Sequence, residues 1–144
     1  MVNNIVKIFF LNDNGQVLLM RKKDKVELWH LWSISFKDSE IIGDVIINKV
    51  YEELNIKLKK DDLKLIAKKE KMDVINNLYF YYVKIGLDKK LILKNGLLEE
   101  KWFKIDELLK LAQYKDNNIE FDKNSLSLLK RIRRISNIYN RNFM

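Results

Sequence analysis

The sequence predicts a mixed fold of strands and helices, either α+β or an α/β sandwich. Three observations lead to this prediction. Segments rich in β-branched and aromatic residues recur along the chain, which is typical of strands. The apolar residues change to helical spacing between Ser39 and Asn55. A second amphipathic segment, Asn124–Tyr139, closes the chain, so one helix is expected early and another late.

The chain is expected to open with a hairpin. Two strands are predicted at Asn4–Leu11 and Gln16–Met20. The residues between them, Asn12–Gly15, favour a tight turn because Asn and Gly accept the positive φ that hairpins need. The polar segment Arg21–Leu28 is then expected to be a loop, and Trp29–Phe36 is expected to enter a short strand.

The first helix is predicted from a run of apolar residues that recur three and four positions apart. These residues are Ile42, Val45, Ile46, Val50 and Leu54. Ser39 is expected to cap the N-terminus, with Glu40 in the first turn, where a carboxylate meets the positive end of the helix dipole. Asn55 is expected to end the helix in the left-handed conformation.

The second half of the chain is expected to alternate strands with two helices. Further strands are predicted at Leu63–Met72, Leu78–Ile85, Lys90–Leu93 and Lys101–Lys104. Asp73–Asn77 would connect the first two of them, and Asn95-Gly96 would form a turn. Helices are predicted at Asp106–Gln113 and Asn124–Tyr139, and the second of these is basic and amphipathic.

The composition indicates one folded domain over residues 1–144. The chain is 47% hydrophobic and 33% charged, which is typical of a globular domain with a core. It has no Cys, so it can form neither a disulfide framework nor a thiolate metal site. No apolar run is long enough to span a bilayer, and Met1–Ile8 lacks the pattern of a signal peptide. A cytoplasmic location is therefore expected.

The chain is basic, with a formal net charge of +8 and a pI near 9.5. Basic runs occur at Arg21–Lys25, Lys57–Lys60, Lys68–Lys71 and Lys130–Arg134. Such a charge attracts phosphates, nucleotides or nucleic acid. The alternative is that these runs are simply solvated surface, and the sequence leaves both interpretations open.

The segment Glu40–Ile56 carries the motif with the most chemical content. Its spacing resembles the box of the Nudix hydrolases, G-x5-E-x7-R-E-U-x-E-E-x-G-U, where U is a bulky aliphatic residue. Glu40 stands at the first Glu of the box, Val50 at the aliphatic position, and Glu52 and Glu53 at the paired acids.

The segments that flank the box are also similar to Nudix proteins. The opening hairpin, with NDNGQVLLMRKK, resembles their first two strands. Trp32–Ser35 resembles the W-x-I-S stretch of relatives of isopentenyl-diphosphate isomerase, and Lys101–Leu108 resembles the late strand and helix of the family. The resemblance implies an α/β/α sandwich with a mixed sheet, and a homodimer, since Nudix proteins are often dimers.

The resemblance also implies a reaction. Nudix enzymes substitute water at phosphorus in a diphosphate, and divalent cations, Mg²⁺ or Mn²⁺, offset the phosphate charge. Carboxylates are the natural ligands of such cations, and helix positions 49, 52 and 53 project from one side. By this resemblance Glu52 and Glu53 are the metal ligands and Glu53 is the catalytic residue. Three further residues are candidate supporting carboxylates: Glu40, Glu99 and Glu100.

The box and the loop before it depart from the family pattern in three respects. Asn48 and Lys49 replace its Arg-Glu pair, Asn55 replaces its Gly, and the Gly-Gly of the preceding loop is missing. Lys49 puts an ammonium where the family has a carboxylate, which should weaken the binding of a divalent cation. Lys49 could also pair with Glu53 one turn along the helix.

Two functional hypotheses follow. The first is a hydrolase that cleaves a nucleoside or other organic diphosphate with a divalent cation, its activity weakened or lost through the altered box. The second is a non-catalytic Nudix-fold protein that binds a phosphorylated ligand, such as a nucleotide, or RNA. In the second hypothesis the ammonium of Lys49 contacts the phosphate in place of a metal, and Lys130–Arg134 adds contacts to an RNA backbone.

Overall fold

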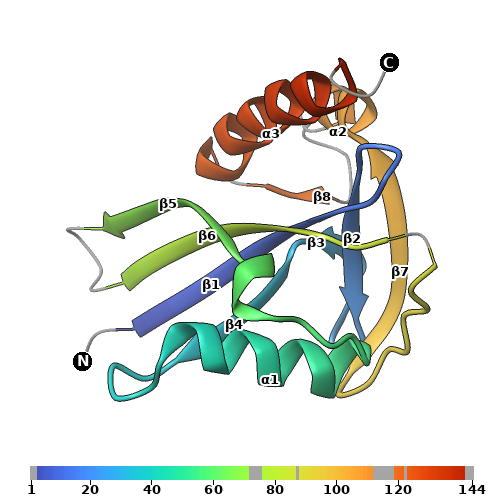
Figure 1. The fold of residues 1–144 in the computed structure, drawn as a ribbon. Helices are drawn as coiled ribbons and strands as arrows, with labels where there is room; N and C mark the ends of the chain where they lie inside the picture. Colours follow the sequence, from blue (N-terminus) through green and yellow to red (C-terminus); the bar gives the residue numbers. More distant parts are fainter. Residues whose placement is uncertain (1–2, 72–75, 87, 112–118, 122, 142–144) are drawn as a thin grey trace.

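A computed structural model describes residues 3–71, 76–86, 88–111, 119–121 and 123–141. In this part of the chain, helices cover both faces of a sheet (Figure 1). The strands are β1 (Asn3–Leu11), β2 (Gln16–Lys22), β3 (Lys25–His30), β4 (Trp32–Phe36), β5 (Lys64–Lys71), β6 (Asn76–Lys84), β7 (Leu97–Lys104) and β8 (Ile119–Glu120). The helices are α1 (Ile42–Leu54), α2 (Ile105–Leu111) and α3 (Lys123–Arg141), with a 3₁₀ turn at Lys60–Asp62.

The sheet is mixed, as the sequence predicted. Its main path runs β5-β6-β1-β2-β3-β8, and β4 pairs with β1 while β7 pairs with β2. The β1–β6 and β3–β8 pairs are parallel, and the other pairs are antiparallel. β1 and β2 each pair with three other strands: β1 with β2, β4 and β6, and β2 with β1, β3 and β7.

Strand β1 is buried on both faces of the sheet. Its side chains alternate between the two faces, and each face is covered by helices. Val6, Ile8 and Phe10 point into the core between the sheet and α1, which we call the core below α1. Phe9 and Leu11 point into the core between the sheet and helices α2 and α3, which we call the core below α2 and α3. All five are at most 2% exposed. The sequence of the strand is therefore a nearly continuous apolar run, and its side chains contribute to both cores of the molecule.

Helix α1 covers one face of the sheet through Ile46, Val50 and Leu54. Helices α2 and α3 cover the opposite face, where Leu108 and Leu129 are fully buried. The expectation of an α/β/α sandwich is thus confirmed. None of the described helices combines the length and the apolar character that a bilayer crossing requires.

Helix α1 begins later than the sequence suggested. Its N-cap is Ile41, not Ser39, and Glu40 lies before the helix. Glu40 instead closes a turn on Lys37: its N–H donates to the Lys37 carbonyl (2.9 Å), and its carboxylate accepts from the Lys37 N–H (2.8 Å). The Glu40 N–H and carboxylate are thus engaged in this turn and are not available to a helix that begins at Ser39. The predicted end is confirmed, since Asn55 is left-handed with φ 59°.

The predicted loop Arg21–Leu28 is wrong in most of its length. Strand β2 continues to Lys22 and β3 begins at Lys25, so only a tight turn separates them. The segment is polar, but antiparallel pairing uses main-chain groups that every residue carries. The short strand β8 was not anticipated, and β7 begins at Leu97, four residues before the predicted Lys101.

The predicted strand at Lys90–Leu93 is also wrong, because the main chain here bonds to the end of α1 and not to a strand. The N–H groups of Ile92 and Lys94 donate to the carbonyls of Leu54 (3.1 Å) and Glu53 (2.9 Å). The segment thus satisfies carbonyls that the end of α1 leaves without intrahelical partners. The Asn95-Gly96 turn follows as predicted. Residues 76 and 77 of the connection expected at Asp73–Asn77 belong instead to β6. The rest of that connection lies outside the described residues, as does Gln113, where the end of a helix was expected.

The packing of α1 on the sheet can be tested at Leu54, which is fully buried. We expect Leu54→Ala to lower the free energy of unfolding by about 2–5 kcal/mol, because it opens a cavity in the core. Tyr51→Ala is the control on the same helix, since Tyr51 is 45% exposed, and it should cost less than about 1 kcal/mol. Urea denaturation of both variants checks this, and equal losses would contradict it.

Candidate functional site

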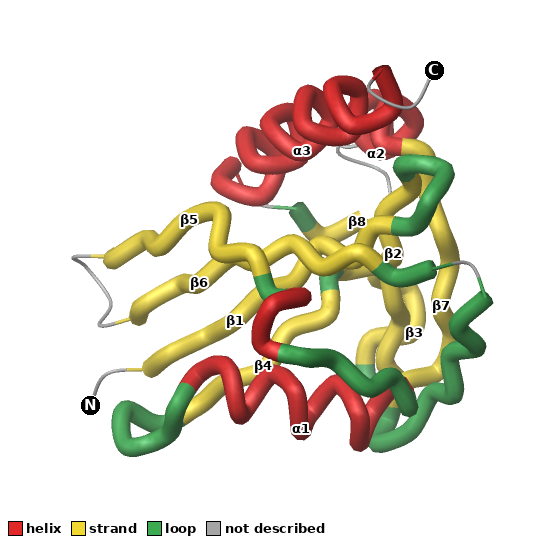
Figure 2. The backbone as a smooth tube through the Cα atoms, viewed as in Figure 1, coloured by secondary structure: helices red, strands yellow, loops and turns green. Residues whose placement is uncertain are grey.

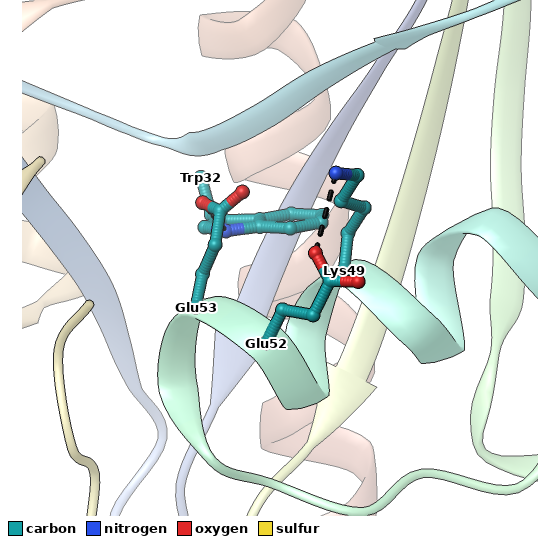
Figure 3. Close-up of polar contacts among 4 residues, drawn as sticks. All are labelled: Trp32, Lys49, Glu52 and Glu53. Atoms are coloured by element: carbon teal, nitrogen blue, oxygen red, sulfur yellow. Dashed lines mark hydrogen bonds and ion pairs between the residues drawn. The ribbon is translucent and has the colours of Figure 1, made fainter. Parts of the chain in front are cut away.

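The two acids of the box lie in the last turn of α1, where the helix meets the sheet. Glu53 faces Trp32 of β4, whose Nε1–H donates to Glu53 Oε1 at 3.2 Å. Trp32 itself is 1% exposed and packs edge-on against Phe10 of β1. The indole is therefore held rigidly by the core, and it fixes one carboxylate oxygen of Glu53 (Figure 3).

Glu53 is half-buried, and this burial raises the pKa of its carboxyl above the ordinary value. The charge of Glu52 adds to the rise. The hydrogen bond from Trp32 and the positive charges of Lys22 and Lys49 act in the opposite direction without cancelling it. Glu53 is thus a partly desolvated carboxylate among positive groups, which is a setting that active sites often use.

Lys49 pairs with Glu52, not with Glu53. Its Nζ lies 3.2 Å from Glu52 Oε2, three residues along the helix, and both side chains are about half exposed. In the view of Figure 3, the Lys49–Glu52 pair lies on one side of the Trp32 indole and Glu53 lies on the other side. The ammonium therefore offsets the charge of one of the two acids that the box supplies.

Strand register separates the two candidate carboxylates of β7. Glu99 lies opposite Arg21, and Glu100 lies opposite Met20. Directly paired residues share a face of the sheet, and Met20 belongs to the core below α1. Glu100 is therefore on the face that carries Glu53.

Glu99 is turned to the other face and is engaged there. Its carboxylate forms an ion pair with Arg21, whose guanidinium lies 4.8 Å from the ring centre of Trp29. Trp29 packs against Phe103, in the core on the side of α2 and α3. Of the two acids, only Glu100 thus lies on the same face of the sheet as Glu53.

Glu40 lies at the opposite end of α1 from Glu53. The helix has 13 residues, so its ends are about 20 Å apart. The Glu40 carboxylate accepts a hydrogen bond from the Lys37 N–H in the turn described above. At that separation Glu40 cannot share a cation with Glu53, and its contacts are those of a turn residue.

A cavity of about 250 Å³ opens where the sheet divides. Strands β1 and β2 are paired at Leu11 and Val17 and then diverge, with β4 following β1 and β3 following β2 (Figure 2). The lining is mostly polar and comes from both halves of the sheet and from the start of α3. It consists of Ile5, Lys7, Lys22, Asp24, His30, Leu31, Ser33, Glu120 and Ser125.

Lys22 connects this cavity to the end of α1. It lines the cavity, and its charge also acts on the carboxyl of Glu53. The sequence offered little to single it out, because it is one of several basic residues after β2. Its position depends on a shift in the register of β2 with β7 between Arg21 and Lys22. No pattern in the sequence predicts this shift.

The donor set fits one divalent cation. Glu52 and Glu53 provide carboxylate oxygens, which are the ligands that Mg²⁺ prefers, and one or two protein carboxylates suffice when substrate phosphates complete the shell. Within the described residues, no three acids or histidines lie close enough to form a metal site by themselves. Lys49 occupies the place of the missing third acid.

The burial of Glu53 predicts a pH-dependent stability. Because its pKa is raised on folding, the folded protein holds the proton more firmly than the unfolded chain, and this contribution is lost as the pH rises through the raised value. We therefore expect Glu53→Gln, which can still accept the hydrogen bond from Trp32, to raise Tm at pH 7. The gain should disappear below about pH 4, where the carboxyl is protonated in both states.

Thermal unfolding at both pH values checks this expectation. Glu107→Gln, at an exposed position of α2, is the control and should change stability by less than about 0.5 kcal/mol at either pH. A lower Tm for Glu53→Gln at pH 7 would mean that the charge of Glu53 stabilises the fold.

Comparison with known proteins bears on the fold. No family model and no curated protein sequence matches the chain. A C. elegans Ap4A hydrolase, solved as a binary complex, is similar in structure with a TM-score of 0.65 and 15% identity, over 91% of this chain and 96% of its own. The NUDIX domain of Shewanella oneidensis NrtR, solved with ADP ribose, has a TM-score of 0.67 and 12% identity, over 93% and 88%.

A third match is a MutT/nudix family protein from Enterococcus faecalis, with a TM-score of 0.59 and 18% identity. It aligns with 72% of this chain, and the aligned part spans 44% of the length of the E. faecalis chain. Identities this low establish architecture and leave activity open. Together with the mixed sheet, the two helical layers and the position of the box on α1, they show that this chain has the Nudix fold.

Proposed function

We propose that the chain binds a nucleoside diphosphate, or another organic diphosphate, in the cavity between the halves of the sheet and hydrolyses it slowly with one divalent cation. The observation that carries the proposal is the position of Lys22, which lines the cavity and also acts on Glu53. A ligand bound there would place its phosphates beside the end of α1. The relatives solved with ADP ribose and named for Ap4A hydrolysis support this class of ligand.

In this proposal Glu53 is the catalytic residue. Trp32 holds Glu53 Oε1, so the other oxygen is oriented for a cation or for a proton of the attacking water. The partial burial that raises its pKa makes the carboxylate a better proton acceptor than a fully solvated one. Glu52 would share the cation, and Glu100 would support the site from the same face of the sheet.

A bound Mg²⁺ or Mn²⁺ would supply charge stabilisation for the phosphates and lower the pKa of its water. The lysines contribute to the binding of the substrate. Lys22 would attract the phosphates into the cavity, and Lys49 would contact a phosphate from α1. Lys49 also opposes the cation, because its ammonium stands 3.2 Å from Glu52. This opposition is the reason for expecting slow turnover.

A second candidate is a non-catalytic protein that binds a phosphorylated ligand without metal. The Lys49–Glu52 ion pair favours it, since it places a fixed positive charge where a cation would otherwise be needed. Both candidates use the same cavity and the same lysines. They differ in whether Glu53 does chemistry, so experiments on the carboxylates and on Lys49 distinguish them.

Lys49→Glu is the sharpest test of the site. It restores a third carboxylate, and we expect at least a tenfold gain in affinity for Mn²⁺ and a faster hydrolysis of the best substrate from a panel of organic diphosphates. Calorimetry and phosphate release measure these two effects. Lys57→Glu is the matched control, because Lys57 lies just beyond α1, with its Nζ 5.8 Å from the ring centre of Tyr51, and the variant has the same net charge.

Three outcomes of this series decide between the candidates. Hydrolysis that is unchanged in Glu53→Gln overturns the catalytic role of Glu53. Tight Mg²⁺ binding by the unmodified protein overturns the idea that Lys49 opposes the cation. Saturable binding of the ligand in EDTA, with no hydrolysis in either the unmodified protein or Lys49→Glu, establishes the second candidate.

Lys22→Met tests the link between the cavity and Glu53. Because Lys22 lowers the pKa of Glu53, its removal should raise that pKa further, which NMR titration of the carboxyl carbon can follow. The same variant should weaken ligand binding by about tenfold, since a charged hydrogen bond to phosphate is lost. Lys23→Met, in the exposed turn after β2, is the control, and an equal effect of both variants would contradict a specific role for Lys22.

A further inference from the structure

The net charge of the protein is concentrated on one helix. The segment that forms α3, residues 123–141, contains six Lys and Arg residues and no Asp or Glu. The other 22 Lys and Arg residues are nearly balanced by all 20 acids of the chain. Six of the eight net positive charges therefore belong to α3, which is a far stronger asymmetry than the scattered basic runs indicate.

The fold turns the basic side chains that are described on α3 outward. Leu128, Leu129 and Ile132 are at most 4% exposed and pack in the core against the sheet. The basic residues between and after them are exposed: Lys130, Arg131, Arg133 and Arg134. Figure 1 shows α3 lying across the face of the sheet opposite α1, on the outside of the fold.

Basic residues of β5 extend this surface on one side of α3. The Arg131 guanidinium donates to the carbonyl of Ile66 in β5 at 3.2 Å, which ties the helix to the strand. Register places Lys64 opposite Tyr82 and Lys69 opposite Leu78. Tyr82 and Leu78 belong to the core below α2 and α3, so the two exposed lysines share the face of the sheet on which α3 lies.

A groove of about 740 Å³ borders α3 on its α2 side. Arg133 lines it together with Lys104 and Lys110, and the turn between β1 and β2 forms its far wall. Two acids, Asp106 and Glu107, also line the groove, and Asp106 pairs with Arg133 at 3.1 Å. The basic surface therefore runs from this groove across α3 to β5, and we call it the α3 surface.

We propose that the α3 surface binds the phosphate backbone of nucleic acid. The surface combines exposed basic residues of β5, of α3 and of the groove beside α2, and a duplex carries one phosphate charge per ~1.7 Å of its axis. The surface can thus meet several phosphates at once. No exposed side chain described on α3, residues 124–134, is aromatic, which favours contacts to phosphate over the stacking of bases.

The same observations argue against a membrane as the partner. A basic helix that binds a bilayer inserts an apolar face between the lipids, and the apolar face of α3 is already buried against the sheet. The proposal is also independent of the chemistry at Glu53. The α3 surface lies on the side of the sheet opposite α1, so binding there requires neither a cation nor hydrolysis.

Fluorescence anisotropy with labelled oligonucleotides tests the proposal. The probes are single-stranded RNA, duplex RNA and duplex DNA of about 16 nucleotides per strand, a length that covers one site. The test variant is Lys130→Glu with Arg134→Glu, two exposed residues one turn apart on α3. The control is Lys89→Glu with Lys90→Glu, which makes the same change in net charge in an exposed loop near the end of α1.

We expect the unmodified protein to bind at about 50 mM salt and to lose affinity steeply as salt rises. The α3 variant should bind at least tenfold more weakly. Its log–log salt slope should be shallower by about 1.4 on single strands, the value for two lost phosphate contacts. The control should stay within about twofold of the unmodified protein, and circular dichroism should show that both variants are folded.

Three results would overturn the proposal. The first is no binding of any probe at about 50 mM salt. The second is an equal loss of affinity in the α3 variant and the loop control, which would make net charge the cause. The third is binding to anionic phosphatidylserine vesicles but not to nucleic acid. The ranking of the three probes identifies which nucleic acid the surface prefers.

Discussion

The burial of β1 on both faces is the constraint on which the rest of the molecule depends. Its side chains enter the core under α1 and the core under α2 and α3, and its main chain pairs with three other strands. Because it pairs in parallel with β6 and in antiparallel with β4, it fixes the mixed character of the sheet. The sheet divides where β1 leaves β2, and that division creates the cavity that we assign to the ligand.

The chemistry of the candidate site follows from how the end of α1 meets this sheet. Trp32 is locked in the core and reaches one oxygen of Glu53, while the loop at Ile92 and Lys94 holds the last carbonyls of the helix. Glu53 is therefore rigid and partly desolvated. Glu52, only one residue away, is exposed and paired with Lys49. The two acids of the box thus have different environments, which a sequence motif represents as equivalent.

The two layers of helices differ in their electrostatics. The α1 face carries acids and lysines in close mixture, a balance that suits the positioning of a small phosphorylated ligand. The α3 surface has an excess of positive charge, since the segment that forms α3 contains six Lys and Arg residues and no acid. A small ligand needs convergent groups in a cavity, whereas a polymer of phosphates needs a long surface of one sign. This contrast is the physical basis for assigning different partners to the α3 surface and to the site at the end of α1.

The sequence by itself determined most of the local structure. Apolar spacing placed α1 and α3, turn residues placed the hairpin at Asn12–Gly15, and Asn55 marked the end of α1. These features depend on neighbours within a few residues, which the sequence records directly. The wrong predictions concern hydrogen bonds that the pattern of residue types does not specify. The role of residues 92–94 depends on main-chain hydrogen bonds, which any residue type can make. The turn that delays α1 to Ile42 combines one such bond with a second from the Lys37 N–H to the Glu40 carboxylate.

Only the tertiary structure decided how the candidate residues are arranged and which others join Glu52 and Glu53. Strand register turned Glu100 toward the face of Glu53 and Glu99 toward Arg21, although the two are adjacent in sequence. The divergence of the strands brought Lys22 to both the cavity and Glu53, and side-chain packing paired Lys49 with Glu52 instead of Glu53. Register and packing join segments that are distant along the chain, and residue periodicity carries no information about which distant segments meet.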